Sequence, residues 1–158
     1  MLDAALIPFM RNGLHATSLS DLEIATGLSK GSLYKAYPSK REMFIAVLQR
    51  CLTDLQARLN DADLDEWFAM WCCDPEDMHP GIELAVRTAA MASYDDPEVG
   101  RELAAFFETC RQNLKPKLAQ NRAMEVLGLA QGFAVEAIRQ DRQVKPSIRD
   151  AALAKLLA

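Results

Sequence analysis

The sequence has little that would support a membrane span, a disulfide framework or a metal site. No apolar run reaches the roughly 18–20 residues that cross a bilayer, and no basic segment followed by an apolar one opens the chain. The four cysteines, Cys51, Cys72, Cys73 and Cys110, form no CxxC motif, and only two histidines are present. We therefore predict a cytoplasmic protein with free thiols, no metal ion and no cofactor.

Strand and catalytic signatures are also missing. No segment sustains an alternation of apolar and polar residues, and the one Asn-Gly pair, at residues 12 and 13, follows a helical pattern and does not join two strands. The motif HExxH and a phosphate loop are absent, and no spacing between histidine and carboxylate or cysteine indicates a nucleophile. Residues 27–31 match GxSxG, but they join two predicted short helices, whereas a nucleophile elbow joins a strand to a helix. The sequence predicts an all-α protein and argues against an enzyme.

Charge is divided unevenly along the chain. The net charge of −4 by itself disfavours a nucleic-acid partner. Residues 1–60 contain seven basic and five acidic residues, however, whereas residues 61–158 contain eleven and seventeen. The stretch 28–41 has no acid and four basic residues, which are Lys30, Lys35, Lys40 and Arg41. This local positive charge suits a phosphate backbone, although a solvated basic face explains the same pattern.

Three capped helices are expected within the first 40 residues. A first amphipathic helix ends at Asn12-Gly13, and Ser18 with Asp21 forms a capping box for a second helix. Ser29 caps a third helix that reaches Tyr37. Two short helices behind a packing helix are the layout of a DNA-reading helix-turn-helix, and the third helix begins with small polar residues and a cation that suit base edges.

Caps and prolines divide the rest of the chain into further helices. Pro38 ends the third helix, and Asp96-Pro97 is a strong helix start. The predicted segments are about 39–60, 63–73, 81–94, 97–118, 121–140 and 146–158, so we expect about nine helices in all.

The register of the N-terminal motif is specific. Its residues are Gly13, Thr17-Ser18, Asp21-Leu22, Gly27 to Tyr34, and Tyr37 to Lys40. In this register the chain resembles the tetracycline-repressor (TetR) family. The resemblance implies an all-α homodimer, with a helix-turn-helix DNA-binding domain at 1–40 and a ligand-binding and dimerisation domain at 41–158. It also implies a repressor that a small-molecule ligand releases from a double-stranded, palindromic operator.

The resemblance also implies which residues contact DNA. Bases and nearby phosphates would be contacted by Lys30, Gly31, Ser32, Tyr34 and Lys35, and the DNA backbone by Thr17, Ser18, Tyr37 and Lys40. Glu23 departs from the family pattern, which has a small alanine there. We expect its side chain either to extend into solvent or to lie near the basic helix.

Aromatic and methionine residues of the larger domain are candidates for an effector pocket. They are Trp67, Phe68, Trp71, Met91 and Phe106, together with Arg87. A plain core or a dimer interface explains any single apolar member better, although as a group some of them can face a pocket. Arg87 can instead pair with Glu83 one turn earlier, and we favour that salt bridge. The candidate dimer interface is a small and apolar face of the last two helices, comprising Leu127, Gly128, Gln131, Leu153 and Leu156.

Two alternatives use the same scaffold. The adjacent thiols of Cys72 and Cys73 could sense oxidants, which would make the protein a redox-switched regulator. A helix-turn-helix adaptor that acts mainly through protein interaction is the other alternative, and loss of sequence-specific DNA binding would favour it.

Overall fold

The computed structural model of the chain describes residues 1–74, 77–91, 96–118, 122–140 and 145–157. Within these ranges the chain forms nine α-helices, one 3-10 turn and no strand, which confirms the all-α prediction. The helices are α1 (Leu2–Ala16), α2 (Leu19–Thr26), α3 (Lys30–Ala36), α4 (Lys40–Asp61), α5 (Leu64–Ala69), α6 (Pro80–Met91), α7 (Pro97–Leu114), α8 (Ala123–Gln140) and α9 (Pro146–Leu157).

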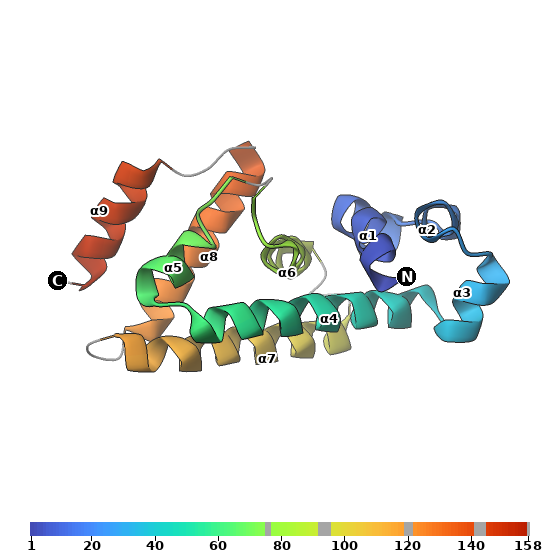
Figure 1. The fold of residues 1–158 in the computed structure, drawn as a ribbon, viewed down its shortest axis with the longest axis horizontal. Coiled ribbons are helices and arrows are strands. Elements are labelled where there is room, and N and C mark those ends of the chain that lie inside the picture. The colour runs from blue at the N-terminus through green and yellow to red at the C-terminus, as the bar shows by residue number, and fades with distance from the viewer. Residues whose placement is uncertain (75–76, 92–95, 119–121, 141–144, 158) are drawn as a thin grey trace.

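The molecule is elongated. Helices α1, α2 and α3 lie at one end and α9 lies at the other, while α4 and α7 run side by side along the length between them (Figure 1). Helix α4 packs against α1, α6 and α7, and α8 packs against α6, α7 and α9. Helix α4 therefore connects the three N-terminal helices to the larger helical body.

The N-terminal helices form where their caps predict. Helix α1 is interrupted at Gly13, whose φ of +72° lies in the left-handed region that glycine adopts without strain. The capping box of Ser18 and Asp21 opens α2, and the Ser29 side chain accepts a hydrogen bond from the Ser32 N–H at the start of α3. Leu22 and Leu33 are the buried residues of α2 and α3 and join these short helices to the core.

Helix α4 supplies the longest apolar stripe of the fold. Ser39 caps it, and the turn at Pro38 separates it from α3. Its buried residues are Met43, Phe44, Ile45, Val47, Leu48, Leu52, Leu55 and Leu59. Its first turn contains the predicted domain boundary at residues 40 and 41. That division stays a prediction, because α4 belongs to the packing on both sides of it.

Several helix ends differ from the sequence prediction. Helix α5 stops at Ala69 and continues as turns, whereas the sequence predicts a helix to residue 73. Helix α7 ends at Leu114, and a 3-10 turn at Lys115–Lys117 follows, because Pro116 cannot continue the α-helical hydrogen bonding.

Among the described side chains of α9 only Leu153 is buried. None of the described helices has both the length and the apolar character that a bilayer crossing requires.

Candidate DNA-binding interface

Helix α3 presents almost all of its surface to solvent. Leu33 is its only buried residue. The residues predicted to contact bases or phosphates are all exposed, and they are Lys30, Gly31, Ser32, Tyr34 and Lys35. The Lys30 ammonium lies 5.9 Å from the centre of the Tyr34 ring, so the cation and the phenol share one side of the helix.

The Glu23 carboxylate lies at the start of α3. Its Oε1 accepts a hydrogen bond from the backbone N–H of Lys30 at 2.6 Å. Of the two expected positions for this side chain, the structure shows the one near the basic helix. The contact satisfies one of the amide groups that a helix N-terminus leaves without a partner. Helix α3 is therefore held by α2 as well as by its own cap at Ser29.

Two residues predicted to hold the DNA backbone make hydrogen bonds within the protein, and their contact with DNA stays a prediction. The Thr17 side chain is buried, and its hydroxyl donates to the carbonyl oxygens of Pro8 and Gly13 at 3.1 and 2.6 Å. The Lys40 ammonium donates to the carbonyl oxygens of His15 and Thr17 at 3.0 and 2.6 Å. The carbonyl groups of His15 and Thr17 lie at the end of α1, where the helix offers them no further N–H partner. Both side chains therefore stabilise the junction between α1 and α2.

Ser18 and Tyr37, the other two residues predicted to contact the DNA backbone, differ in how exposed they are. The Ser18 hydroxyl is exposed but donates to Asp21 Oδ2 at 2.7 Å as part of the α2 capping box. This bond lowers the pKa of Asp21 from its ordinary value. Tyr37 is half-buried and packs against the core. Contact of these residues with DNA stays a prediction.

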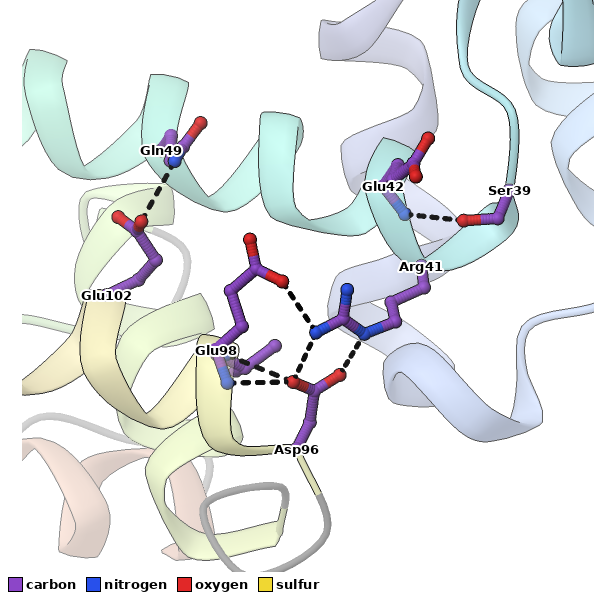
Figure 2. Close-up of polar contacts among 8 residues, drawn as sticks. Ser39, Arg41, Glu42, Gln49, Asp96, Glu98 and Glu102 are labelled. Carbon is purple, nitrogen blue, oxygen red and sulfur yellow. Dashed lines mark hydrogen bonds and ion pairs between the residues drawn. The ribbon is translucent and has the colours of Figure 1, made fainter.

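Arg41 does not point toward a DNA-facing surface. Figure 2 shows its guanidinium between two carboxylates at the start of α7. Its Nε and a terminal nitrogen donate to the two oxygens of Asp96 at 2.5 and 2.7 Å, and the same terminal nitrogen donates to Glu98 at 2.8 Å. The guanidinium lowers the pKa of Asp96 to about 2. The positive charge counted over 28–41 is therefore partly neutralised by residues 55 and 57 positions later.

The predicted effector-pocket residues divide into core and surface. Trp67, Phe68, Trp71 and Phe106 are buried, and the two indoles stack with their centres 5.4 Å apart. Both indole N–H groups lack a hydrogen-bond partner among the described residues. Arg87 is exposed and pairs with Glu83 at 2.8 Å, as the salt-bridge alternative predicted. The Met91 side chain lies outside the described residues.

A cavity of about 1030 Å³ lies apart from these residues, between α1, α4 and the segment that leads into α6. Its lining includes Leu6, Cys51, Met70 and Met78. At its edge His79 joins the two sides, because its Nε2 lies 2.8 Å from the Asp54 carboxylate. The sequence did not predict this cavity, since its walls come from segments far apart in the chain.

The predicted dimer-interface residues lie on α8 and α9, and those of α8 are divided between a buried and a free face. Leu127 is buried within the monomer, as is Leu153 of α9, so neither is free for a partner. Gly128 is exposed, Gln131 is half-buried, and the Leu156 side chain lies outside the described residues. Two apolar residues on the free face were not predicted, Met124 and Val135, which are 64% and 48% exposed.

The four cysteines form no disulfide, and burial disfavours their thiolate form. Burial raises the pKa of Cys72 and of Cys110 to about 12, and that of Cys51 to about 11. Burial also raises the pKa of Cys73. Among the described residues no group of three or more His, Cys, Asp or Glu residues can hold a metal ion.

Comparison with known proteins agrees with this geometry. Residues 1–47 match the family model of the bacterial regulatory proteins of the tetR family. The HTH-type transcriptional regulator RutR of Escherichia coli strain K12 is 32% identical over 103 residues, and RutR of Shigella flexneri has the same identity. Those residues make up 64% of this chain but only 43% of either relative, so the match spans less than half of their length.

Two solved structures share the fold over nearly the whole chain. A crystal structure of the transcriptional regulator FadR from Bacillus subtilis, in complex with stearoyl-CoA, has a TM-score of 0.70 at 13% identity and covers 99% of this chain and 96% of its own. Salmonella enterica GusR has a TM-score of 0.66 at 20% identity and covers 98% and 90%. RutR and FadR are both named as transcriptional regulators. The helix-turn-helix region of this chain, residues 1–47, is thus similar to the tetR family of bacterial regulatory proteins.

Proposed function

We propose that the chain is a sequence-specific DNA-binding transcriptional regulator, and that it acts as a repressor which a small-molecule effector releases from DNA. The observation that carries the proposal is α3, a capped helix that buries Leu33 and leaves every other side chain accessible. Lys30, Ser32, Tyr34 and Lys35 provide the donors that base edges and phosphates accept. The match of residues 1–47 to the tetR family model supports the same conclusion.

The proposed active form is a homodimer on a palindromic operator. A dimer needs its two reading helices about one turn of DNA apart, or a multiple of that distance, to enter successive major grooves. The free face of α8 supports such a dimer. Exposed apolar residues, Met124 and Val135, flank Gly128 on this face, and a Cβ atom added at Gly128 would meet nothing within 4 Å. A second copy of α8 can approach such a face closely.

The proposed effector is apolar and carries a hydrogen-bond acceptor. The unpaired indole N–H groups of Trp67 and Trp71 support this class, because a buried donor without a partner costs about 1–3 kcal/mol that an acceptor would recover. FadR, which shares the fold, was crystallised with stearoyl-CoA, a long acyl thioester. An effector that binds better to a state in which the two α3 helices of the dimer are farther apart or closer together would change DNA affinity about 5- to 150-fold.

Selection of bound DNA from a random pool tests the proposal directly. The expected result is one enriched palindromic sequence, bound by two chains in analytical ultracentrifugation. Enrichment of no sequence would overturn the proposal and favour an adaptor that acts through protein contacts. A single enriched half-site bound by one chain would retain DNA recognition and overturn the dimer.

A further inference from the structure

Two consecutive residues at the start of α4 bind two different helices. Lys40 donates to the carbonyl oxygens of His15 and Thr17 at the end of α1. Arg41 binds Asp96 and Glu98 at the start of α7, as Figure 2 shows. We propose that these contacts form a joint in which Asp96 is a positioning residue for DNA recognition. Asp96 sets the orientation of the reading head, which is α2 and α3 (residues 19–36), relative to the larger helical body from α4 onward. This inference rests on the proposed function.

The Asp96 carboxylate performs two tasks at once. It caps α7, because its Oδ1 accepts hydrogen bonds from the backbone N–H groups of Glu98 and Val99 at 3.0 and 3.3 Å. Its two oxygens also accept hydrogen bonds from Nε and one terminal nitrogen of Arg41, at 2.5 and 2.7 Å. A bidentate contact of this kind fixes direction as well as distance. The first turn of α7 and the first turn of α4 are therefore tied through one side chain.

The reading head is attached to the same turn. Only the segment 37–39 separates the end of α3 from Lys40, and Ser39 caps α4. The Lys40 ammonium reaches across to Thr17, directly before the α2 cap at Ser18. A change in the position of α7 is thus passed through Arg41 to α4, and through Lys40 to the junction from which α2 and α3 start.

The expected consequence concerns orientation more than stability. Arg41 is 42% exposed, so solvent screens the ion pair on one side and its contribution to the free energy of unfolding is modest enough for the chain to stay folded without it. Farther along the same helices Gln49 donates to Glu102 at 3.0 Å, so α4 and α7 remain in register when the joint is broken. A broken joint should therefore leave a folded protein whose reading head is held less firmly.

The variants can be chosen so that the fold is preserved. Asp96→Asn removes the charge but keeps a side chain that caps a helix equally well. Arg41→Gln removes the guanidinium, and the double variant completes a cycle. Arg111→Gln is the matched control, because Arg111 also makes a two-pronged contact, with Glu108 at 2.5 and 2.8 Å, but within α7 alone.

The first measurement is amide hydrogen exchange of residues 19–36 in the full chain. Asp96→Asn and Arg41→Gln should each speed exchange in this region about five- to tenfold, the double variant should add little, and Arg111→Gln should leave it unchanged. A merely structural cap at α7 predicts no change in the reading head. Exchange there that is equal to wild type in both single variants would overturn the joint.

The second measurement is affinity for the selected operator and for versions with one base pair added to or removed from the spacer. Wild type should prefer one spacing, and both joint variants should lose about five- to tenfold in affinity there and bind the three spacings more evenly. Retention of the wild-type spacing profile by both variants would overturn the positioning role. If wild type selects no DNA, the proposed function fails, while hydrogen exchange still decides whether the joint exists.

Discussion

The carboxylate of Glu23 accepts a hydrogen bond from the backbone N–H of Lys30 at 2.6 Å, and so joins the two helices of the helix-turn-helix across the turn between them. The first amide groups of a helix lack partners within the helix, and a negative charge beside them is stabilising. Glu23 therefore fixes the start of α3 from outside that helix. Its contact gives a direct reason for an acid at this position.

Replacement of Glu23 should lower the stability of the helix-turn-helix formed by α2 and α3. We expect Glu23→Ala to lower the free energy of unfolding by about 0.5–2 kcal/mol, as the loss of a helix cap does, and to speed hydrogen exchange in α3. Glu23→Gln keeps an acceptor oxygen and should lose less. Urea unfolding of the three proteins checks the order, and equal stability of Glu23→Ala and wild type would contradict the capping role.

Gly81 marks a close approach between α6 and α4. A Cβ atom at this position would lie 2.7 Å from the carbonyl oxygen of Cys51, and backbone atoms cannot rotate away as a side chain can. We expect Gly81→Ala to cost about 1–3 kcal/mol through overpacking. Gly31→Ala is the control, because its nearest contact would be the Ser29 hydroxyl at 4.0 Å. Thermal unfolding should separate the two variants, and equal melting temperatures would contradict the packing.

Local signals in the sequence were sufficient for most of the helices. Ser18, Ser29 and Asp96 were predicted to start helices, and each accepts a hydrogen bond from a backbone N–H of its helix. A cap is readable because its partner lies two or three residues away. The end of α7 was predicted less closely: the segment was expected to reach residue 118, but the α-helix ends at Leu114, because a proline can end a helix as well as kink it.

Contacts between distant segments could not be read in the same way. Arg41 looked like part of a basic DNA-facing stretch, because the acids that bind it lie 55 and 57 residues away. Lys40 looked like a phosphate ligand, but its ammonium reaches carbonyl groups 23 and 25 residues earlier. The sequence alone does not distinguish a basic residue that contacts DNA from one that pairs within the protein, because the pairing partners are distant in sequence. The amphipathic pattern of α8 likewise could not show that Leu127 is buried.

The Arg41–Asp96 pair should make stability depend on pH in the acid range. The guanidinium holds the pKa of Asp96 at about 2, below its ordinary value of 3.8, so the folded chain binds this proton less tightly than the unfolded chain. The contribution is therefore complete above about pH 4 and is lost as the pH falls toward 2. Asp96→Asn should be less stable than wild type at about pH 6, and the difference should shrink between about pH 4 and pH 2. A difference that stays constant over this range would contradict the shift.

Thiol chemistry should be slow in the native protein. Burial raises the pKa of Cys72 and Cys110 to about 12, and the thiolate is the reactive form. At about pH 7.5 we expect these two residues to react with iodoacetamide roughly a thousandfold more slowly than in urea. Cys72→Ser should then bind DNA as wild type does, before and after peroxide treatment. Loss of DNA binding on oxidation in wild type alone would restore the redox-switched alternative.

The roles of Lys35 and Lys40 can be separated by the salt dependence of DNA binding. Lys35 is exposed on α3, whereas the Lys40 ammonium already donates to the carbonyl oxygens of His15 and Thr17. A lysine that neutralises a phosphate releases counterions, so its removal reduces the slope of log affinity against log salt by about one for each phosphate left without its cation. Lys35→Gln should reduce the slope by about two in a dimer, because each protomer supplies one such lysine.

Lys40→Gln should behave differently if its main task is to hold α1. We expect it to lower the free energy of unfolding and the affinity for every DNA sequence, with a slope close to that of wild type. Binding isotherms at several salt concentrations, on the selected operator and a scrambled one, measure both effects. If Lys40→Gln reduces the slope as much as Lys35→Gln does, its ammonium leaves the α1 carbonyls for a phosphate in the complex. If neither variant changes affinity on either DNA, α3 is not the reading helix.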